Sequence, residues 1–208
     1  MKKSLFLLLS IFFLFSCDNT IENAKMVKKA LEGKLLEDKF LSIEKGFDST
    51  FSANQLKVSQ IADSLVGNAE VKTIIGASNY TIEFLQNYKK ELNKYVEEEK
   101  KNTPLTKDYV FQMQYSLEQK NAYQLEKELE NYITTINSLN PKFSFEHIAL
   151  DADEIKEFKN NPEQNKKDFA QLNFQKTPLL AANAILSQLK LEVVNVELKA
   201  LEILSEKE

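Results

Sequence analysis

Arginine and tryptophan are absent from this chain of 208 residues, which also has one cysteine, one histidine, four glycines and four prolines. A lone cysteine forms no disulfide within the chain, so the fold depends on its core alone. Because arginine is missing, the bidentate guanidinium clamp for phosphate or carboxylate groups is missing too. A β-sandwich or β-barrel needs many turns and normally uses more glycine and proline. This scarcity favours long helices.

The charge balance is mildly acidic, with 31 Asp and Glu against 27 Lys and a formal net charge of −4 at pH 7. The lysines are interspersed with glutamates and form no basic cluster. Nucleic acids and anionic membrane surfaces attract proteins through clustered positive charge. The sequence therefore argues against both as partners.

The N-terminus has the pattern of an export signal. Two lysines precede an apolar run, Leu5–Phe15, that is interrupted only by Ser10. Such a run is too short to span a bilayer of about 30 Å as a helix, so residues 1–16 are predicted to be a signal peptide. Its end, Leu-Phe-Ser before Cys17, resembles the lipobox of bacterial lipoproteins, whose cysteine is acylated with chains such as palmitate.

Acylation of Cys17 predicts a lipid anchor in the cell envelope, with the domain in the periplasm. Whether the inner or the outer membrane holds it stays open. The alternative is a plain secretory signal cleaved near Ser16, with an incidental cysteine. The only cysteine of the chain stands where acylation requires it, which favours the anchor. Residues 17–208 are predicted to form one helical domain, because no linker rich in Gly, Ser or Pro divides them.

The best-patterned helix is the last one, predicted for Thr177–Ser205. Thr177 is a suitable N-cap, and Pro178 fits the first helical position, where its missing N–H costs nothing. The first two turns are apolar on nearly every side, so this helix is expected to be buried among several others. Its apolar residues recur at spacings of three and four, at Leu179, Ala182, Leu186, Leu189, Val193, Val196, Ala200 and Ile203.

Similar patterns along the chain predict an all-α bundle of about five to six long helices. Gly46 is a plausible end for the first helix, and Asn140-Pro141 closes another. Residues 142–148 instead alternate with period two, which predicts a short strand or an extended loop. The first helix is expected to bury Leu31, Leu35, Phe40 and Ile43. The other predicted helices cover approximately residues 20–45, 48–67, 68–101, 121–139 and 163–172.

The chain supplies few of the parts that an active site requires. His147 is the only histidine, so no multi-histidine metal site can form, and no G-x-S-x-G turn occurs. Residues 151–154 open like a calcium loop, but Ile155 and Lys156 stand where a ligand and the tight-turn glycine are required. We therefore predict no catalytic, cofactor-binding or metal-ligating residues and no enzyme activity. A hydrolase centred on His147 is the least favoured alternative.

A second alternative is an envelope lipoprotein that binds a small or peptide ligand between its helices, through faces rich in tyrosine and phenylalanine. At helical spacing, however, tyrosines more often line the rim of a core with the hydroxyl in water. The tyrosines are Tyr80, Tyr88, Tyr95, Tyr109, Tyr115, Tyr123 and Tyr132.

The entry to the last helix carries a family resemblance. Residues 168–182 read Asp-Phe-Ala-Gln-Leu-Asn-Phe-Gln-Lys-Thr-Pro-Leu-Leu-Ala-Ala. This stretch resembles the end of the N-terminal periplasmic domain of the GldM and PorM family, which belongs to the gliding-motility and type IX secretion machinery. The family has an aromatic residue, an Asn-Phe pair, a proline and an alanine-rich helix there, with tryptophan usual where Phe169 stands. Residues 185–193 and Glu197 look like the same helix continued.

The resemblance implies an all-helical bundle that acts as a structural part and not as a catalyst. Full family members carry a transmembrane helix that engages a motor partner, followed by several β-rich periplasmic domains. This chain is expected to have a lipid anchor in place of that helix and to end before those domains. The resemblance thus predicts a non-enzymatic interaction or scaffold protein of the envelope, with another envelope protein or a second copy as partner and no cofactor.

Overall fold

Five helices follow one another in the computed structural model, which describes residues 20–102, 121–155 and 166–206. These ranges contain no strand, so the all-α prediction is confirmed. Four of the five helices are long, and one has only six residues. In chain order they are α2 (Thr20–Ser64), α3 (Ala69–Asn102), α5 (Asn121–Leu139), α6 (Phe169–Phe174) and α7 (Leu179–Ser205).

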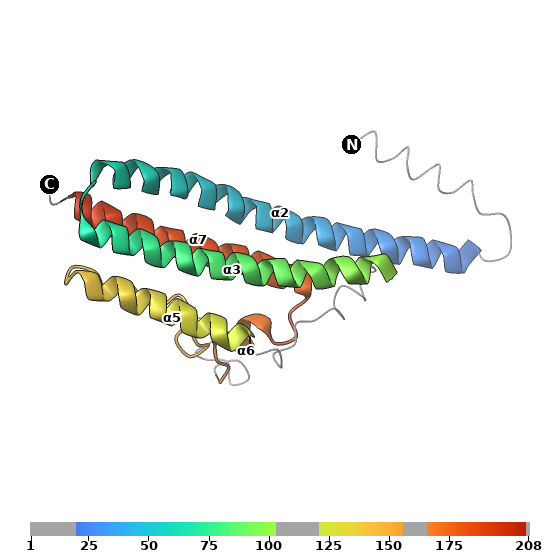
Figure 1. The fold of residues 1–208 in the computed structure, drawn as a ribbon. Helices are drawn as coiled ribbons and strands as arrows, with labels where there is room; N and C mark the ends of the chain where they lie inside the picture. The colour runs from blue at the N-terminus through green and yellow to red at the C-terminus, as the bar shows by residue number, and fades with distance from the viewer. Residues whose placement is uncertain (1–19, 103–120, 156–165, 207–208) are drawn as a thin grey trace.

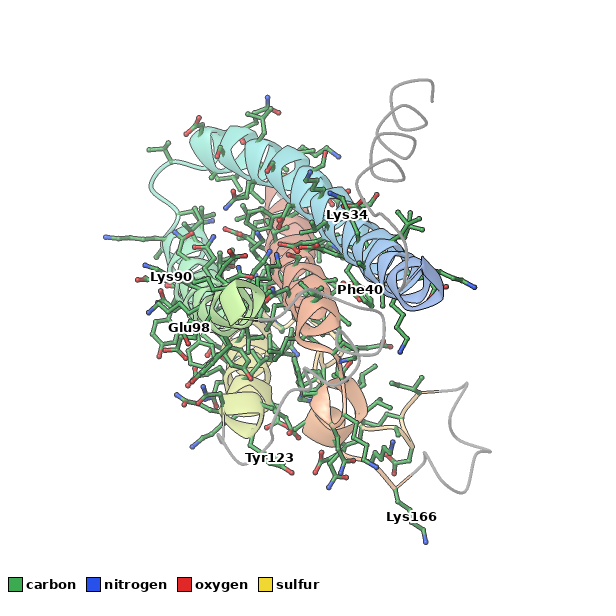
Figure 2. All side chains as sticks on the ribbon, turned by 90° about the vertical axis from the view of Figure 1, so that its right-hand side faces the viewer. Lys34, Phe40, Lys90, Glu98, Tyr123 and Lys166 are labelled. Atoms are coloured by element: carbon green, nitrogen blue, oxygen red, sulfur yellow. The ribbon has the colours of Figure 1, made fainter. Side chains whose placement is uncertain are left out.

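Helix α7 is the central element of the bundle. It packs against both α2 and α3, while α5 packs on α3 and α6 (Figure 1). In the view along the bundle, α7 lies between α2 and α3 (Figure 2). Val193, Val194, Ala200 and Leu201 of α7 are completely buried. The prediction of a buried C-terminal helix is therefore confirmed.

The start of α7 differs in detail from the sequence prediction. Pro178 is the N-cap and the helix begins at Leu179, without a side-chain cap. The Thr177 hydroxyl instead donates to the backbone oxygen of Asn173 at 2.8 Å. The predicted Thr177 cap is wrong because this hydroxyl satisfies a free carbonyl at the end of α6, one of the orphan acceptors that every helix end leaves. Lys176, with φ of 60°, makes the turn between the two helices.

Helix α2 runs through the predicted break at Gly46 as one helix of 45 residues. A glycine inside a helix costs only about 1 kcal/mol relative to alanine. Phe51 and Val58 beyond the glycine are buried in the core, and that burial outweighs the local cost. Asp48, the first residue of the helix predicted for residues 48–67, lies inside α2, and its carboxylate pairs with Lys190 of α7 at 2.6 Å. The prediction of two separate helices here is wrong.

Two helical glycines are expected to be suboptimal for stability. Gly46 and Gly76 lie inside α2 and α3, are exposed, and have no atom within 4 Å of the place where a Cβ would stand. Replacing both by alanine should raise the free energy of unfolding by about 1–2 kcal/mol in total, measured by chemical denaturation. Gly67 is the control, because its φ of +95° strains any other residue, and Gly67→Ala should destabilise. A double variant no more stable than the parent would contradict this account.

The contact between α2, α3 and α7 contains a half-buried ionic network. Lys89 of α3 pairs with Glu44 at 2.6 Å and donates to the Ser187 hydroxyl at 2.6 Å. Lys190 pairs with Asp48 and lies 4.4 Å from the centre of the Phe51 ring. Burial raises the pKa of Asp48, but the hydrogen bond and charge of Lys190 and the charge of Lys89 outweigh it and lower the pKa overall. Such specific polar pairs fix the register in which the three helices pack.

The N-terminal half of α2 is less covered than predicted. Leu31, Leu35 and Ile43 are 44%, 61% and 41% exposed, so their predicted burial is wrong. Leu36 and Phe40 pack on a small second cluster, formed by Val96 of α3 and Leu180 of α7. Leu31 and Leu35 are exposed because the N-terminal end of α2 extends beyond the start of α7 (Figure 1).

The remaining predicted segments have mixed outcomes. The helices predicted for residues 68–101 and 121–139 agree with α3 and α5 to within a residue or two. Residues 143–147 have neither helix nor strand, so the extended-loop alternative is the one observed. The helix predicted for 163–172 begins later, at Phe169. The predicted signal peptide of residues 1–16 and the predicted lipid attachment site, Cys17, lie outside the described residues.

Candidate functional site: a groove along helix α7

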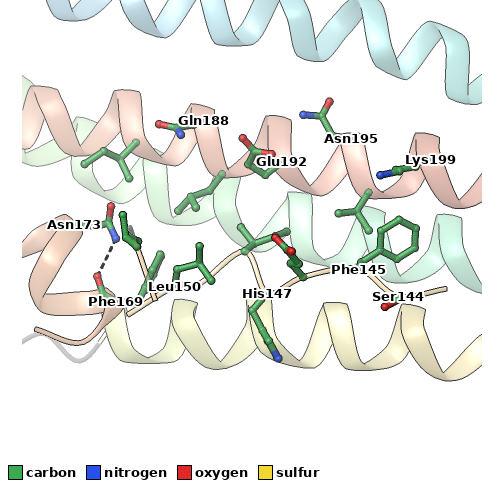
Figure 3. A pocket seen from close by; sticks show the side chains of 16 residues that line it. Ser144, Phe145, His147, Leu150, Phe169, Asn173, Gln188, Glu192, Asn195 and Lys199 are labelled. Atoms are coloured by element: carbon green, nitrogen blue, oxygen red, sulfur yellow. Dashed lines mark hydrogen bonds between the residues drawn. The ribbon is translucent and has the colours of Figure 1, made fainter. Parts of the chain in front are cut away.

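The residues considered for chemistry do not come together in the fold. His147 is exposed and points away from α7 (Figure 3). Within the described ranges, no group of three or more His, Cys, Asp or Glu side chains is placed to hold a metal ion. The described tyrosines are divided, with Tyr88 and Tyr132 buried and Tyr80, Tyr95 and Tyr123 exposed on other surfaces. Tyr109 and Tyr115 lie outside the described residues.

A groove of about 680 Å³ lies between α7 and the loop that follows α5. Figure 3 shows α7 along one side and the loop, from Ser144 to Leu150, along the other. Its volume is in the range of ligand and peptide sites. No described tyrosine lines it. Apolar side chains include Phe145, Ile148, Leu150, Ile155, Phe169, Ile185, Leu189 and Val196, and polar ones include Ser144, Glu146, Gln188, Glu192, Asn195 and Lys199.

The groove follows one stripe of α7 because its lining residues recur every three or four positions, from Ile185 to Lys199. At 1.5 Å per residue this stripe is roughly 21 Å long. On the α2 side, Asn195 is fixed by Asn54 of α2, whose amide donates to it at 2.8 Å. The floor is apolar and only partly covered, since Ile185 and Val196 are half-buried.

The loop wall of the groove is anchored at its start. The turn after α5 is closed by Asn140, whose backbone oxygen accepts from Phe143 N–H at 2.9 Å and whose side-chain oxygen accepts from Lys142 N–H at 3.1 Å. The amide of Asn140 also donates to Glu70 of α3 at 3.0 Å. Phe143 is buried, and its ring lies 5.7 Å from that of Phe145. The wall is therefore held by the core and not only by its own backbone.

Phe145 is held in the manner of a strand residue. Its N–H donates to the side-chain oxygen of Asn137 at 2.9 Å, and its carbonyl accepts from the Asn137 amide at 3.0 Å. The side chain of Asn137 on α5 thus takes the part that a neighbouring strand would take. In an extended chain, the backbone groups of successive residues point to opposite sides. Those of Ser144 and Glu146 consequently point away from α5.

One end of the groove meets α6, whose first N–H groups are occupied by carboxylates. Asp168 accepts from Gln171 N–H at 2.7 Å, and Asp151 accepts from Phe169 N–H at 2.8 Å. Glu126 of α5 accepts from Ala170. Burial, followed by the nearby charges of Asp168, Asp151 and Glu130, raises the pKa of Glu126 to about 7. These carboxylates cap a short helix and hold the end of the loop in place.

A buried polar network crosses the core on the other side of α7. The Tyr132 hydroxyl donates to the Val193 carbonyl at 3.0 Å and lies 3.0 Å from the Ser78 hydroxyl. Ser78 is also the hydrogen-bond partner of Glu197, which is only 3% exposed. Burial raises the pKa of Glu197 to about 7, and the Ser78 hydrogen bond offsets this only in part. A second cavity of about 570 Å³, between α2 and α3, borders this carboxyl and Asp63.

The sequence contained a signal for one wall of the groove but not for the groove itself. The period of two over residues 142–148 predicted the extended wall. Which stripe of α7 stays uncovered depends on where α2 and α3 pack, and that is a tertiary property. Glu197 was also missed, because a glutamate on a helix is most often a solvated residue.

The comparisons with known proteins give one match. The family model described as the GldM N-terminal domain matches residues 34–207, more than half of the chain. No curated protein and no solved structure matched the chain. The match spans α3, α5, α6, α7 and most of α2, as well as the groove. This chain therefore belongs to the GldM N-terminal domain family.

Proposed function

We propose that this protein is a lipid-anchored, non-enzymatic interaction or scaffold protein of the bacterial cell envelope, linked to gliding motility or type IX secretion. The family match over residues 34–207 carries the proposal, because it associates the chain with an envelope motility and secretion component. The partner would be another envelope protein or a second copy of the chain. Residues 17–208 would act as one domain held at a membrane by acylated Cys17.

The packing of α7 supports an anchor at the N-terminus. By length and composition, α7 could cross a membrane, and it is the one described helix of which this is true. Half of that apolar segment is buried inside the bundle, however, where it packs on α2 and α3. Placing it in lipid would require the core to separate, at the cost of the burial that holds the bundle together. An acyl chain on Cys17 leaves the bundle intact.

Cys17→Ser tests the anchor directly. The variant should lose acylation and, once residues 1–16 are removed, leave the membrane fraction, whereas the parent chain should float with membranes and incorporate radiolabelled palmitate. Asn19→Ser, two residues further on, is a matched control that should remain acylated and membrane-bound. A Cys17→Ser chain that remains on membranes after removal of residues 1–16 would overturn the anchor.

The scaffold role is tested by identifying the proteins that the chain binds. Crosslinking and purification of the tagged chain from membranes should recover a defined envelope protein or a second copy of the chain. Recovery of neither, together with a strictly monomeric purified chain, would contradict the role. Either result is independent of Cys17, because it concerns the helical domain.

A second candidate function is favoured by one observation. The groove along α7 offers an apolar floor with polar groups along its edges, which is the usual character of a ligand site. A lipoprotein that binds a small or peptide ligand is therefore retained as the alternative. None of the described tyrosines lines the groove, whereas Phe145 and Phe169 do.

A further inference from the structure

We propose that the groove along α7 binds an extended, basic peptide segment of a partner protein, which pairs with the loop at Ser144 and Glu146 as an added strand. The inference rests on the proposed function, since the segment would belong to the envelope partner. Beyond the proposed function, the inference names the surface that binds the partner and the chemistry by which the partner is recognised. Three observations carry it, namely the free backbone edge, the floor of α7 and the charges beside the groove.

The backbone edge is the first observation. Phe145 directs both of its backbone groups at Asn137, so those of Ser144 and Glu146 face the opposite side. Within the described part of the chain, no hydrogen bond is made by the backbone of Ser144 or Glu146. Both residues are exposed. Unpaired backbone groups in an extended segment are the template to which a peptide strand adds.

The floor of the groove is the second observation. Phe145 lines the groove from the loop, and Ile185, Leu189 and Val196 line it from α7. A strand places alternate side chains on the same face. A peptide paired with the loop would therefore direct every second side chain onto α7. At about 3.4 Å per residue, the stripe of roughly 21 Å accommodates about six residues. Apolar side chains at alternate positions match this floor.

The charge of the groove is the third observation. Glu146 lines the groove from the loop and Glu192 lines it from α7. Lys199 lies toward the Ser144 end (Figure 3). None of the ion pairs among the described residues includes Glu146 or Glu192. Two carboxylates against one ammonium favour a basic peptide, because complementary charge selects the partner. The occupant is thus an extended segment that alternates apolar and basic residues.

The probe is an amidated peptide of seven residues that alternates lysine and valine and carries a fluorescein at its N-terminus. Its binding to the mature chain, residues 17–208 with Cys17→Ser, is measured by fluorescence anisotropy, because this chain has neither the apolar run nor the lipid and needs no detergent. Saturable binding is expected, and the matched glutamate and valine peptide should bind at least about tenfold more weakly. Equal binding of the two peptides would overturn the charge assignment, and no saturable binding of either would overturn the site.

Two protein variants test the backbone edge. Glu146→Pro removes one N–H and places a ring at the edge, while proline suits an extended segment. It should weaken peptide binding by about tenfold or more, because one hydrogen-bond donor and the carboxylate are lost and the ring blocks the approach of the peptide. Glu146→Gln, the matched control, keeps the edge and should weaken binding only a few-fold. Ser144→Pro is a second edge variant. If the Glu146→Pro chain fails to fold, Ser144→Pro takes its place in the test and should weaken peptide binding by the same factor. Binding of a folded proline variant with parental affinity would contradict strand pairing.

N-methylated peptides separate strand pairing from simple apolar contact. Methylation of every second amide blocks one edge of the peptide, and the two possible isomers block opposite edges. Strand pairing through one edge predicts that one isomer binds and the other does not. Equal binding of both isomers would overturn the proposal. If partner recovery from membranes succeeds while these tests fail, the scaffold function stands and the groove is not its surface.

Discussion

Leu186→Asp is expected to unfold the protein. Leu186 is 1% exposed and belongs to the core that α2, α3, α5 and α7 share. Removing a buried leucine costs about 2–5 kcal/mol. A carboxylate without a partner in that place costs several kcal/mol more. Because a domain is stable by only about 5–15 kcal/mol, little folded protein should remain. Loss of the cooperative thermal transition, measured by circular dichroism, would show that the variant is unfolded.

Gln188→Asp is the matched control for this result. It lies two residues further along α7, is exposed, and introduces the same side chain into the same helix. Its effect on the free energy of unfolding should stay within about 0.5 kcal/mol. A soluble, cooperatively folded Leu186→Asp chain would show instead that this face of α7 points outward, toward a partner or a second copy.

Stability is expected to fall as the pH rises from about 4.5 to 7. Burial raises the folded-state pKa of Glu197 to about 7 from its ordinary value of 4.5. Below the unfolded value, both states bind the proton and burial costs nothing extra. Between the two values only the folded state keeps the proton, so stability declines, and above about 7 the loss is complete. A shift of this size corresponds to about 3 kcal/mol at most.

Glu197→Gln should remove this pH dependence while keeping the size of the side chain. It is expected to be more stable than the parent at pH 8 by about 2 kcal/mol and nearly equal to it at pH 5, measured by urea denaturation. Glu202→Gln, exposed on the same helix, is the control and should follow the parent at both values. A Glu197→Gln profile parallel to that of the parent would contradict the assignment.

Only the Ser78 hydrogen bond opposes the effect of burial on the pKa of Glu197. Ser78 and Tyr132 face it from α3 and α5, and Asp63 of α2 borders the same cavity. None of the ion pairs among the described residues includes Glu197. Glu126, whose pKa is also raised to about 7, adds a loss of the same sign. Its contribution is smaller, because its carboxyl is partly solvated. The residual slope of Glu197→Gln should come chiefly from Glu126.

The local sequence was sufficient to predict a helix where the segment has one apolar stripe and a clear signal at each end. Helix α5 illustrates this, since Ala122, Leu125, Leu129, Tyr132 and Ile136 recur at spacings of three and four and are all buried. Asn140-Pro141 ends it as predicted, because a residue before proline avoids the helical region. The alternating residues 142–148 likewise predicted an extended wall of the groove. These outcomes depend on contacts within a few residues.

Local rules failed where distant segments supplied a larger energy. Gly46 did not end α2, because the burial of Phe51 and Val58 beyond it exceeds the cost of one glycine. Leu31 and Leu35 are exposed although they follow a helical stripe, because α2 extends past the partners that would cover them. A stripe shows that a face is apolar but not that another element reaches it.

By itself, the sequence determined the helical class, the buried α7 and the family of this protein, because composition and periodicity are local properties and the segment 168–182 carries the family pattern. The tertiary structure alone decided that α2 is continuous, that Glu197 is buried and that one stripe of α7 lies open beside the loop of Ser144 and Glu146. The physical reason is the same in each case. The environment of a side chain on a helix is set by the segments that pack against it, and those lie far away in the sequence.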